Sequence, residues 1–212
     1  MNTALTSGKY SGTILLADIS GYTVFLEDVR QEHADDSFAD GQIPYAYGLM
    51  SNLLGGIAER IDPPFTLVKF EGDAVFAVGE EGVGPKGSNL VGCITDCYND
   101  FMGRLDEAGL TWTCSCDACE VKQTLDLKFV LHHGSYIVQA IGTHVEVLGP
   151  DITVAHRLLK NSAASQIGSP AYVLFTEAAE AALDLDLDDG LRFAEPIEGA
   201  EPINTVAIPL GA

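Results

Sequence analysis

Hydrophobic and polar positions along the chain divide into short strand-like runs and longer segments with helical spacing. The run Ile14–Ala17 has the length and continuous apolar character of a buried strand. In 42–61, apolar residues recur every three or four positions, which predicts a helix with one buried face. The same criteria predict further helices at 21–30, 90–105, 150–161 and 177–183. Further strands are predicted in 66–78 (a pair around the turn Glu71-Gly72-Asp73), 125–131, 136–141, 144–148, 172–175 and 205–208.

The order of these elements predicts the fold class. Strand, helices, two strands, helix, two strands, helix and strand match a ferredoxin-like β-α-β-β-α-β core with extra C-terminal strand and helix elements. We expect an α+β protein with an antiparallel sheet and helices on one face. One domain over 10–212 accommodates the pattern, with a polar cysteine-bearing insertion at about 109–124 and an acidic, solvated region at about 177–201.

Composition and charge narrow the classes of partner. The 212 residues are 47% hydrophobic, which is enough for a substantial core. Eleven Lys and Arg against 31 Asp and Glu give a net charge of −20, which argues against nucleic acid or an anionic membrane as partner. No apolar run reaches the roughly 20 residues that span a bilayer, and 1–11 lacks the features of a signal peptide. We therefore expect a cytoplasmic protein.

Two aspartates at the ends of strand-like runs are the first candidates for chemistry. Asp18 ends the run that begins near Ile14, and Asp73 is the last residue of the turn between the strands predicted in 66–78. Alone, Asp18 is better explained as a strand-end residue that caps the next turn. Two strands that each deliver an aspartate at a turn can instead hold a divalent metal ion against a phosphate chain.

A cysteine cluster is the second candidate site. Cys114, Cys116 and Cys119 lie within six residues, a spacing that suits one zinc ion better than a disulfide framework. The candidates for a fourth ligand are, in order, Cys97, then Cys93, then His132 or His133. A disulfide or free thiols remain an alternative, and the spacing gives less support to an iron–sulfur cluster. A zinc ion here would stabilise an insertion that has little core of its own.

Three segments resemble the catalytic domain of class III nucleotide cyclases. Residues 17–23 (ADISGYT) resemble the first metal motif of that family, and 69–73 (KFEGD) resemble its second. Residues 133–157, from His133-Gly134 to Arg157, resemble its strand–hairpin–helix segment, in which an Arg follows a Gly by eight positions. Together the segments span about 12–165, and their order supports a cyclase-type fold.

The resemblance implies a role for each matching residue. Asp18 and Asp73, with the backbone carbonyl of Ile19, would bind two Mg²⁺ or Mn²⁺ ions for attack of a ribose 3′-oxygen on the α-phosphorus of a nucleoside triphosphate. Lys69 and Glu146 would recognise the base, a pair of groups that suits adenine better than guanine. Arg157 would stabilise the transition state. The family places this site between two subunits, so the resemblance also implies a homodimer.

The chain departs from the family pattern at several charge-stabilising positions. Thr153 stands where the family has a transition-state Asn, Thr143-His144 follow Gly142 where a basic residue is common, and 198–201 (EGAE) replace a late phosphate-binding Lys. Simple alternatives are a solvent-exposed Lys69, a solvated hairpin Glu146 and an Arg157 paired with surface acids. Three hypotheses follow: a cyclase that uses ATP, a catalytically silent module that binds nucleotide, metal or a protein partner, and a zinc-stabilised interaction protein.

Overall fold

The computed structural model describes residues 5–33, 45–111, 114, 116–120, 124–199 and 201–211. Its strands are β1 (Gly8–Ser20), β2 (Thr66–Glu71), β3 (Ala74–Glu80), β4 (Asp126–Ile141), β5 (His144–Leu148), β6 (Tyr172–Thr176), β7 (Leu191–Glu195) and β8 (Ile203–Pro209). Its helices are α1 (Tyr22–Glu32), α2 (Tyr45–Ile61), α3 (Gly87–Thr111), α4 (Asp117–Glu120), α5 (Pro150–Arg157), α6 (Ala163–Ile167) and α7 (Glu177–Ala182). The expected helix start at 42–44 and much of the cysteine insertion lie outside the described residues.

The strands form one sheet, and together with the helices this confirms the α+β fold class. The strand order is β2-β3-β1-β4-β6-β8-β7, and β5 pairs with β4 off this path. The two longest strands, β1 and β4, run antiparallel at the centre, from Gly8 opposite Val138 to Ser20 opposite Asp126. This register places Asp18 directly opposite Lys128. Side chains of directly opposed residues lie on the same face of a sheet, so the two can meet.

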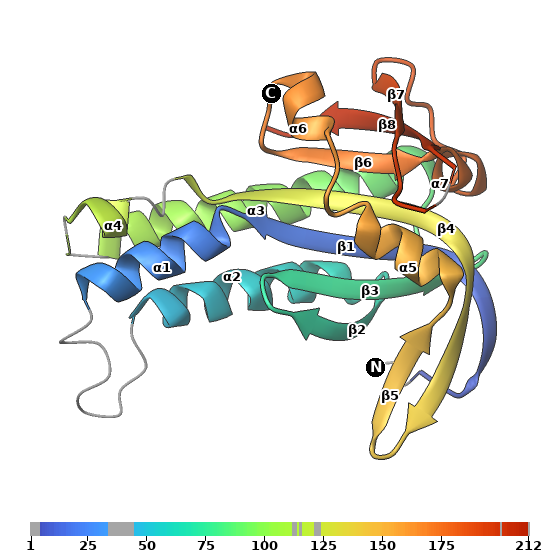
Figure 1. Cartoon of the computed structure of the whole chain (residues 1–212), viewed down its shortest axis with the longest axis horizontal. Coiled ribbons are helices and arrows are strands. Elements are labelled where there is room, and N and C mark those ends of the chain that lie inside the picture. Colours follow the sequence, from blue (N-terminus) through green and yellow to red (C-terminus); the bar gives the residue numbers. More distant parts are fainter. Residues whose placement is uncertain are drawn as a thin grey trace.

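Each face of the sheet has its own hydrophobic core, because side chains alternate along every strand. Leu15, Ala17 and Ile19 of β1 pack with α1, α2, α3 and α7 on one face. Ile14 and Leu16 pack with α5 and α6 on the other face. Figure 1 shows α5 and α3 on opposite sides of β1 and β4. Since Asp18 and Lys128 share the parity of Leu16 and Val130, their side chains lie on the face that α5 covers.

Several details differ from the sequence-based expectation. The pair β4–β6 is parallel, so the sheet is not wholly antiparallel, and α5 packs on the face opposite to α1–α3. The strands expected at 125–131 and 136–141 are one strand, because Gly134 and Ser135 continue the pairing with β1. The acidic region 177–201 contains β7 as well as α7, so part of it belongs to the sheet.

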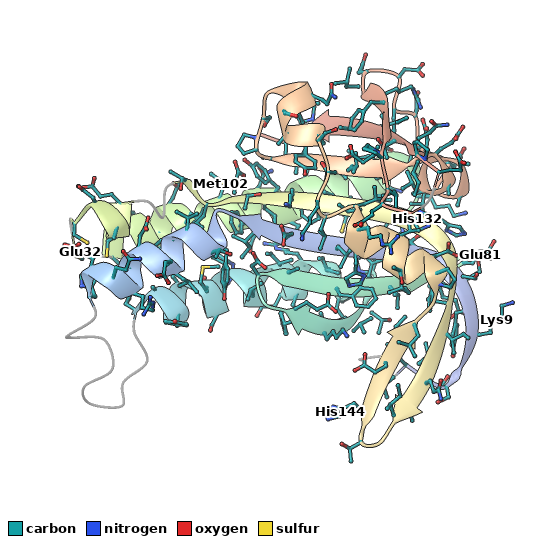
Figure 2. The ribbon with its side chains drawn as sticks, in the orientation of Figure 1. Lys9, Glu32, Glu81, Met102, His132 and His144 are labelled. Carbon is teal, nitrogen blue, oxygen red and sulfur yellow. The ribbon has the colours of Figure 1, made fainter. Side chains whose placement is uncertain are left out.

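The β4–β5 hairpin extends beyond the body of the protein. His144, labelled in Figure 2, lies at its tip, away from all the helices. Apolar side chains on this hairpin are about half exposed: Ile137, Ile141, Val145 and Leu148. An arm with exposed apolar residues at this density is typical of a contact surface.

Candidate functional site

The structure brings Asp18 and Asp73 together at one end of the central strands. Asp18 lies near the end of β1, opposite Ala74 of β3, and Asp73 lies in the turn just before β3. The backbone N–H of Ile19 donates a hydrogen bond to the carbonyl of Asp73 at 3.1 Å, which fixes the end of β1 against the β2–β3 turn. Gly72, with a positive φ of 66°, allows the tight β2–β3 turn that carries Asp73.

The electrostatics of Asp73 show that the two carboxylates interact. Burial raises the pKa of the Asp73 carboxyl, and the charge of Asp18 raises it further, while Lys128 opposes the rise. A cation bound between the two carboxylates would relieve this repulsion. We call Asp18, Asp73 and Lys128 the cation centre.

Lys128 is a member of this centre that sequence reasoning missed. Its Nζ lies 2.9 Å from Oδ2 of Asp18, and the two side chains are only 18% and 14% exposed. The ammonium group also donates to the carbonyl of Leu159 at 3.3 Å. The pair depends on the β1–β4 register, which no local pattern around Lys128 could have revealed. Lys128 therefore neutralises one carboxylate and holds it in place.

The two residues expected to recognise the base, Lys69 and Glu146, also meet. Nζ of Lys69 lies 3.1 Å from Glu146 and 3.2 Å from Glu71. The hydrogen bond to Glu146 raises the pKa of the Lys69 ammonium, burial opposes that rise, and Glu71 adds to it. His156 of α5 joins the group, with Nε2 2.7 Å from Glu71 and its ring edge-on to Phe76. Glu71 and His156 are additional members of this group that the motifs did not indicate.

Arg157 and Thr153 on α5 are engaged with the protein's own backbone. Nη1 of Arg157 donates to the carbonyl of Glu198 at 2.7 Å. Oγ1 of Thr153 donates to the carbonyl of Gly149 at 3.3 Å, one helical turn earlier. The segment where a late phosphate-binding Lys was expected thus supplies a carbonyl group that occupies Arg157.

A third cluster of side chains lies at the opposite end of α1. The ligand atoms of His33, Cys114, Cys116 and Cys119 all lie within 4.8 Å of one another. Nε2 of His33 is 3.2 Å from Sγ of Cys116, 3.3 Å from that of Cys119 and 3.7 Å from that of Cys114. We call these four residues the thiol cluster. Figure 2 shows Glu32, the neighbour of His33, at the same end of the molecule as α4.

The expectation that Cys97 is the fourth member of the cysteine group is wrong, because the structure places His33 beside the three cysteines. Cys97 lies on α3 with 2% of its surface exposed, and it packs in the hydrophobic core. Burial raises the pKa of its thiol to about 12, as in an inert core cysteine. His33 ends α1, where its N–H bonds to the carbonyl of Val29. Its separation from the cysteines by about 80 residues explains why spacing rules did not find it.

Comparison with known proteins places the chain in a family. A model described as "Protein of unknown function (DUF2652)" matches residues 50–167, more than half of the chain. The chain belongs to the DUF2652 family. The matched region includes Asp73, Lys128, the three cysteines and Arg157, whereas Asp18 and His33 precede it.

One relative from Mycobacterium tuberculosis (strain H37Rv) is an uncharacterized protein. It is 30% identical over 120 residues, which are 56% of this chain and 53% of the relative. This chain therefore matches about half the length of that curated relative.

Solved structures of nucleotide cyclases share the fold over nearly the whole chain. The adenylyl cyclase CyaB from P. aeruginosa has a TM-score of 0.65 and 15% identity, with 96% of each chain covered. The guanylyl cyclase Cya2 has a TM-score of 0.67 and 14% identity, with 98% of this chain and 96% of that chain covered. At such identities the likeness establishes the fold of this DUF2652 protein and leaves its activity open.

The two candidate metal sites of this DUF2652 protein offer different donors. The cation centre offers carboxylate oxygens, which suit Mg²⁺ or Mn²⁺. The thiol cluster offers three sulfurs and one imidazole nitrogen in a compact, partly buried group, the donor set of a closed structural zinc site. Among the described residues, no helix combines the length and apolar character needed to cross a bilayer.

Proposed function

We propose that this DUF2652 protein is a divergent nucleotide cyclase-like domain that binds ATP with Mg²⁺ or Mn²⁺ at a homodimer interface and forms a cyclic nucleotide. The observation that carries the proposal is the convergence of Asp18 and Asp73, two carboxylates of like charge. They converge on a fold shared with nucleotide cyclases. Divalent ions held by these carboxylates and the Ile19 carbonyl would supply positive charge against the triphosphate.

The other groups divide the remaining tasks. Lys69 offers donors and Glu146 an acceptor for the edge of a purine base, and their 3.1 Å contact holds both side chains in place for it. The reaction joins the ribose 3′-oxygen to the α-phosphorus and breaks the bond between the α-phosphorus and the oxygen that bridges it to the β-phosphate. Pyrophosphate and the hydroxyl proton are released. Arg157 would meet the developing charge once it leaves the carbonyl of Glu198.

The exposed hairpin supports the dimer. Ile137 and Leu148 are directly opposed on β4 and β5, and with Ile141 they line one face of the arm. Covering this face with a second copy would remove apolar surface from water. In such an arrangement, the cation centre of one copy faces the Lys69 group of the other, as the resemblance to cyclases implies.

The test is a product assay with an inactive control. Purified protein at high concentration is incubated with Mn²⁺ and ATP, and cyclic product is quantified against the Asp73→Ala variant. Formation of cyclic AMP by the natural protein, and none by the variant, is the expected result. Equal signals from both proteins would reject catalysis at this centre.

A second candidate is a module that binds nucleotide without turnover. Arg157 and Thr153 both donate to backbone carbonyls, and the expected transition-state Asn and late Lys are replaced. Donors that meet transition-state charge contribute about 2.7–4 kcal/mol each, so losing two would slow a cyclase by several orders of magnitude. Calorimetry with ATP and Mg²⁺ separates the candidates when it is combined with the product assay. Both candidates bind nucleotide, but only the cyclase forms cyclic product.

We also propose that the thiol cluster holds a structural Zn²⁺. Three thiolates and one imidazole complete a four-coordinate site without an open position for substrate, which favours a structural role over a catalytic one. The ion would join the end of α1 to α4, a helix of four residues that needs such a connection to persist.

A further inference from the structure

The thiol cluster and the cation centre are joined by α1. The helix begins directly after Gly21, three residues beyond Asp18, and it ends at Glu32, with His33 as its C-terminal cap. Phe25 and Val29 fix the helix in the core between these ends. Eleven helical residues span about 16 Å, so a displacement of His33 is transmitted along a short rigid element to the end of β1, where Asp18 lies.

The first turn of α1 lies close to the cation centre. Burial raises the pKa of the Tyr22 hydroxyl, and the charge of Asp73 raises it further. Ile19, two residues before Gly21, holds the carbonyl of Asp73 through its N–H. A shift of this turn therefore changes the separation of the two carboxylates.

Thr124 and Leu125, which follow the cysteines, lie beside Gly21 at the start of α1. A Cβ atom on Gly21 would lie 3.4 Å from the carbonyl oxygen of Thr124 and 3.5 Å from the side chain of Leu125. These residues follow the cysteines and lead into β4, where Asp126 pairs with Ser20 and Lys128 pairs with Asp18. The start of α1 and the residues that lead into β4 therefore lie against each other beside the cation centre.

We propose that Zn²⁺ at the thiol cluster controls the affinity of the cation centre for Mn²⁺–ATP by fixing α1 against the start of β4. The inference rests on the proposed function, since it needs both metal sites. With zinc bound, the two segments are clamped together and Asp18, Asp73 and Lys128 keep their arrangement. Without zinc, His33 and α4 lose their connection, and the α1 turn gains freedom that ligand binding must remove.

The experiment compares the zinc-loaded and the zinc-free protein. Binding of Mn²⁺ with a non-hydrolysable ATP analogue is followed by calorimetry and by the electron paramagnetic resonance signal of free Mn²⁺. Zinc is removed with a chelator selective for zinc over manganese, the chelator is dialysed away, and zinc is then restored. Loss of zinc is expected to weaken Mn²⁺–ATP binding at least about fivefold, within the usual range of coupling between sites, and restoring zinc should reverse the loss.

Two substitutions at one position separate coupling from general damage. His33→Ala should lose zinc and show the weakened binding, whereas His33→Cys offers a fourth thiolate and should keep both zinc and the natural affinity. Cobalt substitution reports site integrity through its thiolate charge-transfer absorption. Equal Mn²⁺–ATP affinity with and without zinc would overturn the coupling alone. Absence of Mn²⁺–ATP binding in zinc-loaded protein would overturn the proposed function and the coupling together.

Discussion

The cation centre lies at the start of α1 and the thiol cluster at its end, and the two are built in different ways. Asp18, Asp73 and Lys128 come from the central strands and an adjacent turn, and the lysine already neutralises one of the two carboxylates. The thiol cluster comes from the end of α1 and the segment between α3 and β4, and three of its four donor atoms are sulfurs. The carboxylates of the cation centre, one of them already paired with the Lys128 ammonium, suit a divalent ion that arrives together with its nucleotide. A compact sulfur site suits an ion that stays.

This contrast gives the thiol cluster the larger part in folding stability and gives the cation centre the direct contacts with the ligand. Removing zinc from the thiol cluster should therefore lower stability more than any change at the cation centre, where replacing the Asp73 carboxylate should weaken ligand binding with little loss of stability. The predictions below test that division, from the largest expected effect to the smallest.

The largest expected effect is on thermal stability after zinc removal. If zinc is about 1,000-fold above its dissociation constant, it contributes about 4 kcal/mol, which corresponds to roughly 10 °C in a protein of this size. Cys116→Ser should lower the melting temperature by a similar amount and reduce the zinc content. Cys93→Ser, outside the cluster, serves as the matched control and should change neither quantity. Loss of zinc with an unchanged melting temperature would remove the structural role.

Asp73→Asn should weaken binding of Mn²⁺ with an ATP analogue by tenfold or more, because the centre loses half of its carboxylate charge. The same substitution removes repulsion from Asp18, so the free energy of unfolding should stay unchanged or rise by less than about 1 kcal/mol. Calorimetry and urea denaturation measure the two effects, and the exposed Asp106→Asn is the control. A variant that binds Mn²⁺ normally would contradict the assignment of Asp73.

Lys128→Met should have opposite effects on binding and on stability. Divalent affinity should rise a few-fold, because an ammonium group no longer repels the incoming ion. Stability should fall by on the order of 2 kcal/mol, since Asp18 is left mostly buried without its partner. Manganese titration and chemical denaturation provide the measurements. Weaker Mn²⁺ binding would show that Lys128 mainly positions Asp18 for the ion.

The smallest effect concerns His132, which lies outside both sites. Burial lowers the pKa of its imidazole, although the charge of Asp151 opposes the shift. In the unfolded chain this histidine protonates near its usual pKa of about 6.5, so below that pH the unfolded state binds more protons and stability falls with falling pH. His132→Asn, which can keep the contact to Thr176, should flatten the pH dependence of unfolding below about pH 6.5. The exposed His144→Asn should not.

Sequence reasoning was strongest where the signal was local. The apolar run before Asp18, the turn at Asp73 and the periodicity of the helices predicted the α+β class, and the resemblance of three segments to nucleotide cyclases predicted the cyclase type. The contact between Lys69 and Glu146 also agrees with the motif-based pairing of these residues. In contrast, the strand β7 was hidden in an acidic segment, because only Glu195 of its five residues is buried and that residue is charged.

The contributions of Lys128 and His33 depend on tertiary structure. Lys128 reaches Asp18 only through the register of two long strands. His33 reaches the cysteines because α1 and α4 pack together, which leaves no trace in residue spacing. Proximity along the chain favoured Cys97, but α3 directs that side chain into the core.

The most direct test of the account is a crystal structure of the full chain soaked with Mn²⁺ and a non-hydrolysable ATP analogue, with anomalous data recorded at the manganese and zinc edges. The account predicts manganese at Asp18 and Asp73, zinc among His33 and the three cysteines, and the triphosphate facing a second copy of the chain. Nucleotide and manganese absent from Asp18 and Asp73, in crystals with zinc at the thiol cluster, would contradict it.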